Sequence, residues 1–385
     1  MLIMESTEDK ARRLAAVNAC DRVLSSGKRP TMRDRLAQLG EYGGLDEQPD
    51  MYGDGVVAEL ERRVAALLGT EDAAFFPTGT MAQQVALRCW AGRTGNRTVA
   101  IHPLAHPEVH ERRTLSALGG LRTVHPTTRP RLPDADEIRD FDEPFGTLML
   151  ELPLRDAGFV LPDWDGLTAT VAAARERDAV VHFDGARLWE CPPHFGRPLP
   201  EIAQLADSVY VSFYKSLGGL SGAALAGPEN LLAEAKAWRH RYGGLVFQQW
   251  PAAVSALYGL DHELPRLPGY VAHAKVVAAA LREALEGEVA FFRIHPGVPQ
   301  THQFQVWLPY PTEVLDAAGL AQAERTRTSV FGKWFDSEVP GLAVTEMTVA
   351  GSALEWTARD VTEAVAVFLD HVLREAEAAG RHPGR

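Results

Sequence analysis

The chain has 385 residues, 46% of them hydrophobic and 23% charged, which is enough to bury one large core and a smaller second one. Its net charge of −12 argues against a surface for nucleic acid or anionic membranes, and no segment has the apolar length of a membrane span or the pattern of a signal peptide. The three cysteines form no close pair and no HExxH cluster occurs, so we expect neither disulfides nor a bound metal, and a reducing, cytoplasmic location.

In chain order, residues 1–45 are predicted to form an N-terminal arm that contains one helix, over residues 8–25. Short apolar segments then alternate with helical segments over residues 46–268. This alternation is typical of an α/β domain with a mostly parallel sheet. We therefore expect the ligand site of the protein to lie in this large domain, at the carboxyl ends of its strands.

The proline-rich segment 264–269 is the predicted domain boundary, because prolines interrupt regular structure. Beyond it, a helix is expected near residues 271–286 and a strand over 303–308. An amphipathic helix is expected near 361–379. These elements predict a small α+β domain over residues 269–385.

The first candidate ligand site is the junction between a short apolar segment, residues 73–77, and a helical segment, residues 81–88. The junction reads Thr78-Gly79-Thr80, and either threonine can cap the helix. The free N–H groups and the dipole at a helix N-terminus favour a dianionic phosphate. Since most such turns are only helix caps, this one predicts a phosphate site in combination with the features that follow.

The second candidate is a buried strand that ends on charged residues. The apolar run 179–183 contains His182 and is followed by Asp184-Gly185-Ala186-Arg187. An unpaired carboxylate at the end of such a strand is costly to bury, so Asp184 is expected to have a partner. Arg187 is a candidate substrate ligand, although it could pair with an acid such as Glu190 instead.

The third candidate is Lys215, which ends the alternating segment 207–214 and precedes a glycine-rich run, residues 216–222. The chain has only six lysines against thirty-three arginines, which suggests that this lysine serves a chemical purpose. An amine can lose its proton and form a Schiff base, whereas a guanidinium cannot. A crossover helix near residues 200–206 would bring Asp184 and Lys215 to the same sheet edge. The alternative is a strand-end lysine that extends into solvent.

These three features together predict a pyridoxal phosphate site. That cofactor needs a lysine for its aldehyde, an acid that keeps its pyridine nitrogen protonated, and a phosphate cradle. The same residues resemble the threonine aldolase and β-eliminating lyase family of fold-type I pyridoxal-phosphate enzymes, from about Tyr52 to Gln249. The matching segments are Tyr52-Gly53-Asp54-Gly55 with Leu60-Glu61, Thr78-Gly79-Thr80, Ala105-His106 with Glu111, Val160-Leu161-Pro162, His182-Phe183-Asp184-Gly185-Ala186-Arg187, Lys215 with its glycine-rich tail, and Tyr242-Gly243-Gly244 with Gln248.

The resemblance implies a role for each matching residue. Lys215 would hold the cofactor aldehyde as a Schiff base, Asp184 would contact the pyridine nitrogen, and His106 would stack on the ring. The turn Thr78-Gly79-Thr80 would hold the phosphate, and Arg187 would contact the substrate carboxylate. His106 lies among other histidines, His102 and His110, so it could instead be a surface residue.

Two positions depart from the family pattern. Where the family has an arginine near the phosphate, this chain has Phe247, and Arg239 and Arg241 are candidates to replace it. Where the family has a second carboxylate-binding arginine, an ungapped comparison places Leu354. The resemblance therefore implies the family chemistry but a substrate that is larger, less polar or differently bound than threonine.

The function expected from the sequence is that of a pyridoxal-phosphate-dependent lyase that cleaves a β-hydroxy-α-amino acid, threonine or a bulkier analogue, into glycine and an aldehyde. His106 or a bound water would remove the hydroxyl proton. The enzyme alternatives are β-elimination, racemisation or aldol transfer, and the alternative of another class is a non-catalytic pyridoxal-phosphate-binding protein. The expected partners are a small amino-acid substrate and further copies of the chain, as a homodimer or homotetramer.

Overall fold

The computed structural model describes residues 7–337 and 339–378. The chain divides into a large unit, Thr31–Leu267, and a small unit, Met1–Pro30 with Pro268–Arg385. The division after Leu267 lies one residue from the expected boundary, whereas the expected arm over 1–45 is split between the two units. The reason is local: Arg22 and Val23 pair with Thr328 and Ser329, which ties the N-terminal segment to the small unit.

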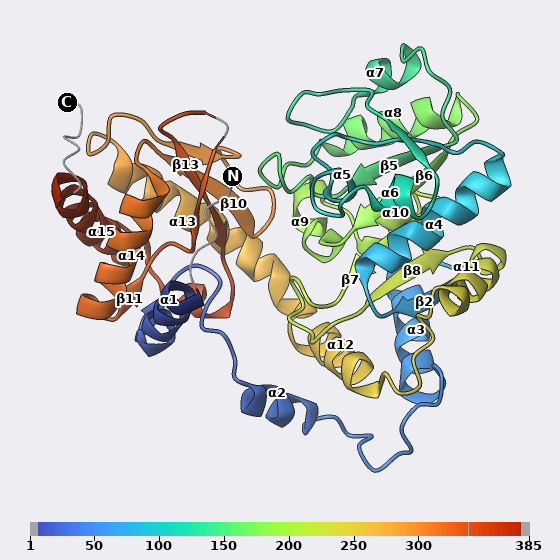
Figure 1. Ribbon diagram of the computed structural model, residues 1–385, viewed down its shortest axis with the longest axis horizontal. Helices are drawn as coiled ribbons and strands as arrows, with labels where there is room; N and C mark the ends of the chain where they lie inside the picture. The colour runs from blue at the N-terminus through green and yellow to red at the C-terminus, as the bar shows by residue number, and fades with distance from the viewer. Residues whose placement is uncertain (1–6, 338, 379–385) are drawn as a thin grey trace. The chain divides into compact units, whose positions relative to one another are not determined.

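The large unit consists of a sheet with helices along its length (Figure 1). Its elements are α2 (Met32–Leu39), α3 (Gly55–Leu68), β2 (Asp72–Phe76), α4 (Gly79–Thr94), β3 (Thr98–Ala100), α5 (His106–Val109), α6 (Thr114–Ala117), β4 (Arg122–Val124), α7 (Ala135–Arg139), β5 (Thr147–Glu151), α8 (Trp164–Arg175), β6 (Val180–Gly185), η1 (Leu188–Glu190), α9 (Pro192–Phe195), α10 (Leu199–Ala203), β7 (Ser208–Ser212), β8 (Ala223–Gly227), α11 (Glu229–Arg241), α12 (Trp250–His262) and η2 (Leu264–Arg266).

The sheet of the large unit has seven strands in the order β2-β8-β7-β6-β5-β3-β4. The strands β7, β6, β5, β3 and β4 pair in parallel, and β8 runs antiparallel to both of its neighbours. Every residue of β5 and β7 is buried, as expected for parallel strands that are covered on both faces. The mostly parallel α/β fold predicted from the sequence is confirmed, including the crossover from β6 through the short helix α10 to β7.

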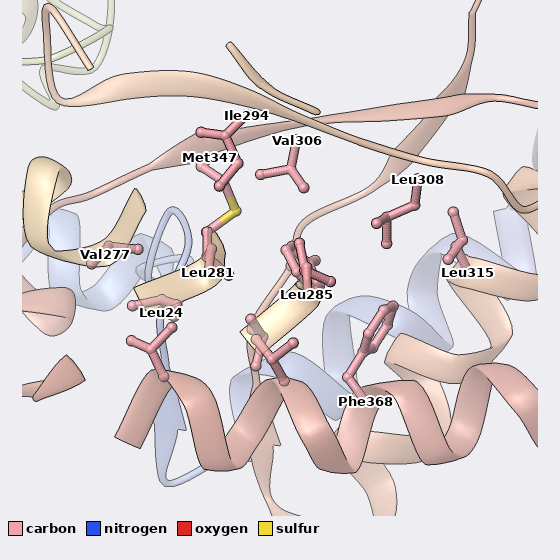
Figure 2. Close-up of a cluster of buried hydrophobic side chains, with 14 of the residues drawn as sticks. Leu24, Val277, Leu281, Leu285, Ile294, Val306, Leu308, Leu315, Met347 and Phe368 are labelled. Carbon is pink, nitrogen blue, oxygen red and sulfur yellow. The ribbon is translucent and has the colours of Figure 1, made fainter. Parts of the chain in front are cut away.

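The small unit contains α1 (Thr7–Ala19), β1 (Arg22–Val23), α13 (Leu267–Leu285), β9 (Arg293–His295), β10 (Gln303–Leu308), α14 (Thr312–Thr326), β11 (Thr328–Ser329), β12 (Trp334–Asp336), β13 (Ala343–Thr348), η3 (Gly351–Glu355) and α15 (Ala358–Ala378). Its four-stranded antiparallel sheet has the order β12-β13-β10-β9. Figure 2 shows its core, where Val306 and Leu308 of β10 face Leu281 and Leu285 of α13 and Phe368 of α15.

The predicted small α+β architecture is therefore confirmed, with β10 at the expected residues. The N-terminal helix α1 ends at Ala19 rather than at residue 25, because β1 forms a separate two-stranded parallel sheet with β11 and Leu24 joins the small unit's core. Within the described residues, the structure has no helix whose length and hydropathy would let it cross a bilayer.

Candidate active site

A row of three ionisable side chains crosses the middle of the large sheet near its carboxyl edge. Glu151 of β5 lies opposite Asp184 of β6, and Asp184 lies opposite Tyr210 of β7. Residues paired across parallel strands point to the same face, so all three side chains lie on one side of the sheet. Each is at most 5% exposed. These strand ends form the floor of the candidate site.

The loop after β7 brings Lys215 to this floor. Backbone hydrogen bonds fix the loop: the Phe213 N–H donates to Gly222 O, and the Gly219 N–H donates to Phe213 O. A Cβ on Gly219 would lie 2.9 Å from that carbonyl oxygen, so this turn needs glycine. Burial lowers the pKa of Lys215 to about 8, and the charge of Arg187 adds to this effect. About a tenth of this amine is therefore neutral at pH 7 and half of it at pH 8, and the neutral form is the nucleophile.

The pKa values of Asp184 and Glu151 are both raised, whereas that of Lys215 is lowered. Burial raises the pKa of Asp184, although the N–H of Ala186 and the charges of His106 and Lys215 act against it. Burial and the neighbouring charge of Asp184 raise the pKa of Glu151 to about 7. Two adjacent buried carboxyl groups are costly to ionise together, so a cation placed against Asp184 would be stabilised there.

The turn Thr78-Gly79-Thr80 starts α4 as predicted. Thr78 caps the helix, since its hydroxyl accepts from the Met81 N–H at 3.2 Å. A Cβ on Gly79 would lie 2.0 Å from the Tyr210 hydroxyl oxygen, so only glycine lets the turn approach β7 this closely. The N–H groups of a first helical turn have no intrahelical acceptor and can donate to a phosphate.

His106 begins α5, where two carboxylates hold it. Its backbone N–H donates to Glu151 at 2.7 Å, and its Nδ1 lies 3.4 Å from Glu111 Oε1. The Thr80 hydroxyl donates to the same Glu111 oxygen at 2.8 Å. Glu111 therefore links the imidazole of His106 to the first turn of α4, which makes His106 part of the site rather than an isolated surface histidine.

These groups surround one hollow. The predicted residues Thr80, His106, Asp184, Arg187 and Lys215 all line it, and Thr78 and Gly79 precede it in the turn. The other lining residues are Gln83, Glu111, Glu151, Ala186, Tyr210 and Tyr214. Among these, the sequence reasoning missed Gln83, Glu151, Tyr210 and Tyr214. Glu151 carried the signal that identified Asp184, an apolar strand that ends on a carboxylate.

The arginines proposed to replace Phe247 are engaged elsewhere. Arg239 is buried, and its Nη1 donates to Glu61 at 2.9 Å and to the Phe75 carbonyl at 2.6 Å. Arg241 lies over the ring of Trp238, 4.5 Å from its centroid. Phe247 itself is half exposed and makes an edge contact with Tyr52. The suggestion that Arg239 compensates for Phe247 is therefore corrected, because its charge is paired with Glu61.

At the second departure, Leu354 of the small unit is 42% exposed. Arg359, the second residue of α15, pairs with Glu363 at 2.6 Å one helical turn later. Both residues therefore remain at the protein surface of the small unit.

The hollow in the large unit suits pyridoxal phosphate chemically. It presents an amine with a lowered pKa, a buried carboxylate that a cation would stabilise, and a glycine turn at a helix start. A pyridinium nitrogen supplies such a cation, and an aldehyde suits such an amine. Lys215 and Asp184 both line this hollow, and the turn Thr78-Gly79-Thr80 borders it.

Comparison with known proteins gives consistent matches. The family described as β-eliminating lyase matches residues 28–291 of the chain. The low specificity L-threonine aldolase of Escherichia coli K12 is 32% identical over 242 residues, which is 61% of this chain and 72% of that protein. The low-specificity L-threonine aldolase 1 of Arabidopsis thaliana is 27% identical over 248 residues, 61% of this chain and 68% of that one.

Solved structures extend the similarity to both units. A protein of Exiguobacterium sp. 255-15, assigned as an aromatic amino acid β-eliminating lyase/threonine aldolase, is 33% identical. The match covers 94% of this chain and 99% of that one, with a TM-score of 0.86. A Listeria monocytogenes protein assigned as an L-allo-threonine aldolase is 31% identical over 95% of this chain and 99% of its own, with a TM-score of 0.85.

Proposed function

This chain belongs to the β-eliminating lyase family, and from that premise we propose that it cleaves a β-hydroxy-α-amino acid into glycine and an aldehyde. It is a pyridoxal-phosphate-dependent lyase of the threonine aldolase type. The observation that carries the proposal is the meeting of Lys215 and Asp184 in one hollow, with the pKa of the amine lowered and that of the carboxyl raised.

Lys215, Asp184 and the turn Thr78-Gly79-Thr80 would hold the cofactor. When bound, pyridoxal phosphate supplies an electron sink for the electron pair released as the Cα–Cβ bond breaks. Asp184 would accept a hydrogen bond from a protonated ring nitrogen, and the positive charge there would offset the burial that raises the pKa of this carboxyl. Lys215 reacts through its neutral amine, which burial and Arg187 make available near pH 8.

We assign the base that removes the substrate's β-hydroxyl proton to His106. Its imidazole lines the hollow, and Glu111 lies 3.4 Å from its Nδ1. A carboxylate at that position stabilises the imidazolium that forms when the histidine takes a proton. The Glu151 carboxylate accepts the backbone N–H of His106 and so fixes the backbone position from which the imidazole extends. Proton removal by a water would instead leave the Glu111 contact without a catalytic purpose.

We assign the substrate carboxylate to Arg187, which lines the hollow beside Lys215. Its charge already lowers the pKa of Lys215, so the two cations share one electrostatic environment. A planar guanidinium can bind a carboxylate through two parallel hydrogen bonds. A substrate carboxylate bound there would also partly neutralise the site and favour the protonated amine.

The experiment that tests this function joins a product assay to a chemical trap. Purified protein supplied with pyridoxal phosphate is incubated with β-hydroxy amino acids, and glycine, aldehyde, keto acid and ammonia are measured. Glycine and aldehyde in equal amounts support the proposal, whereas keto acid and ammonia would indicate β-elimination. Borohydride reduction and peptide mapping should place the cofactor on Lys215, and Lys215→Ala should abolish the visible absorbance band.

Lys236→Ala is the matched control for the trap. Lys236 is half-buried in the same unit, but its Nζ pairs with Asp72 at 2.7 Å and with Glu61 at 3.6 Å. Two carboxylates therefore engage this amine, whereas Lys215 lines the hollow. The control should keep the visible band, and cofactor found on Lys236 or Lys275 would refute the assignment of Lys215.

We also propose that the protein works in the cytoplasm as a homodimer or homotetramer. The described cysteines, Cys20, Cys89 and Cys191, are all buried free thiols. In the large unit Met51, Tyr52, Val246 and Phe247 expose apolar side chains, and Tyr52 and Phe247 are in contact. An exposed apolar patch of this kind suits a second protein copy. Light scattering coupled to size-exclusion chromatography tests this, and a monomeric mass at micromolar concentration would refute it.

A further inference from the structure

A chain of buried polar side chains lies behind the candidate site. The Trp90 indole nitrogen is 2.7 Å from Ser208 Oγ, which is 2.8 Å from His182 Nδ1. His182 Nε2 is in turn 2.6 Å from Gln83 Oε1. All four residues are at most 7% exposed. The proposed catalytic steps do not use any of them.

Donor and acceptor chemistry gives this chain of hydrogen bonds a direction. An indole N–H can only donate, so Ser208 Oγ accepts a hydrogen bond from Trp90 and can donate one through its own hydroxyl hydrogen to His182 Nδ1. Burial lowers the pKa of His182 to about 3, so the ring is neutral. With the Ser208 hydroxyl donating to Nδ1, we assign the one ring proton to Nε2. That N–H donates to Gln83 Oε1, and the amide nitrogen of Gln83 is then the end of the chain.

The Gln83 amide nitrogen is an unusual group in this protein. It is enclosed and has no hydrogen-bond partner among the described residues, and Gln83 lines the same hollow as Asp184. Because the nitrogen has almost no accessible surface, a ligand cannot reach it directly. Its positive end can nevertheless act on a neighbouring charge through the low-dielectric interior.

The neighbouring charge is Asp184. It follows His182 by two positions in β6, so the two side chains lie on the same face, roughly 6.6–6.8 Å apart along the strand. Helix α4 packs across β6 and β7, with Gly79 against Tyr210 and Gln83 against His182 one turn later. Gln83 therefore lies beside the floor position that Asp184 occupies.

We propose that Gln83 is a positioning residue for Asp184, and that the chain from Trp90 through Ser208 and His182 fixes the Gln83 amide with its N–H end toward the Asp184 side of the hollow. Oriented in this way, the amide stabilises the ionised carboxylate. The reverse orientation would place a carbonyl oxygen there and favour the protonated acid. The proposal rests on the proposed function, in which an ionised Asp184 keeps the cofactor's ring nitrogen protonated.

The first test uses the protein without cofactor. We measure the pKa of Asp184 by ¹³C NMR titration, and the tautomer of His182 from its ¹⁵N shifts. Gln83→Leu should raise the pKa of Asp184 by about one unit, the equivalent of a tenfold change. The wild-type His182 ring should carry its proton on Nε2. An unchanged Asp184 titration, or a proton on Nδ1, would overturn the proposal.

The second test separates Asp184 from other contacts of the cofactor. We measure the affinity of the cofactor-free variants for pyridoxal phosphate and for its 1-deaza analogue, in which a carbon replaces the ring nitrogen. Gln83→Leu should weaken pyridoxal phosphate binding about tenfold and leave the analogue unchanged, because the analogue offers Asp184 no ring nitrogen. Equal losses for both compounds would show that Gln83 acts as ordinary packing.

Two further variants keep the test decisive. Trp90→Phe removes the donor that sets the direction of the chain, yet Trp90 does not line the hollow, so a smaller effect of the same selectivity is expected. Gln84→Leu is the matched control: Gln84 is also buried on α4, but its amide faces the backbone of Thr114 and Leu115. It should leave the Asp184 titration and the ratio of the two affinities unchanged. Wild-type protein that binds no pyridoxal phosphate would refute the proposed function, while the NMR titration still decides the role of Gln83.

Discussion

Glu151 and Asp184 lie opposite each other on neighbouring parallel strands, and burial raises the pKa of both carboxyl groups. Glu151 also accepts the backbone N–H groups of His106 and Arg155, so it joins two loops to the sheet at the point where the cofactor is expected. This relationship links the stability of the protein to the pH at which the site works.

The contribution of Glu151 to the stability of the cofactor-free protein should fall as the pH rises from about 4.5 to about 7. The pKa of Glu151 is raised in the folded state from 4.5 to about 7, so the folded protein binds more protons in this window than the unfolded chain. Its contribution is fully present below the lower pKa and is lost through the upper one, with a slope of up to about 1.4 kcal/mol per pH unit. Urea denaturation of wild type and Glu151→Gln should show a stability difference that changes across this window, and a constant difference would contradict the prediction.

Cofactor loading should depend on pH through Lys215. Because the pKa of this amine is about 8, the rate at which the visible band grows in cofactor-free protein should reach half of its maximum near pH 8. Arg187→Gln removes the charge that helps to lower this pKa, so the midpoint should move to higher pH. Arg155→Gln is the matched control with a smaller expected shift, since Arg155 lowers the pKa of Lys215 less than Arg187 does. Stopped-flow absorbance measures all three profiles.

Asp184→Asn should retain the cofactor and lose turnover by several orders of magnitude. A neutral amide cannot stabilise a protonated ring nitrogen, and without that proton the ring is a weak electron sink. Cofactor content by absorbance and glycine release together measure the effect. A variant with a near-normal rate would show that another acid serves the ring nitrogen, and the double substitution with Glu151→Gln would then identify Glu151 as that acid.

Arg239→Leu should destabilise the protein without weakening cofactor binding by the folded fraction. Arg239 neutralises Glu61, whose oxygen also accepts the Phe75 N–H at 2.7 Å. Breaking a buried pair by removing one partner costs about 3–5 kcal/mol. Urea denaturation checks the loss, and adding Glu61→Gln should recover part of it. A selective loss of cofactor affinity would instead restore Arg239 as a phosphate ligand.

Bulky β-hydroxy amino acids, such as phenylserine, should be cleaved with a higher kcat/KM than threonine. Phe247 stands where the family has an arginine near the phosphate, and Leu354 stands where it has a second arginine for the substrate carboxylate. A charged hydrogen bond to a carboxylate contributes roughly 1.5–3 kcal/mol, which corresponds to about one to two powers of ten in affinity. Apolar contacts offset that loss only for a larger side chain. A substrate panel measures the preference. If threonine is the best substrate of the panel, the prediction is wrong. In that case Phe247→Arg should not raise kcat/KM for threonine further.

The sequence by itself determined the fold class and the identity of the main groups. Strands β5, β6 and β7 are short apolar runs bounded by turns, and such patterns arise from burial on both faces of a parallel sheet. Asp184 lies at the carboxyl end of β6 and Lys215 lies in the loop after β7, so their place at the sheet edge could be predicted from topology alone. The Thr78 cap and the glycine after it could also be predicted from the local sequence, because a helix start depends on a few consecutive residues.

Only the tertiary structure decided which side chains meet. The register between β5 and β6 puts Glu151 beside Asp184, and strand pairing is a long-range property that no local pattern specifies. The same holds for Arg239, whose partner Glu61 lies 178 residues away, and for Gln83, whose partner His182 lies 99 residues away. Raised and lowered pKa values follow from burial and from these neighbours, so they too become known only when the chain is folded.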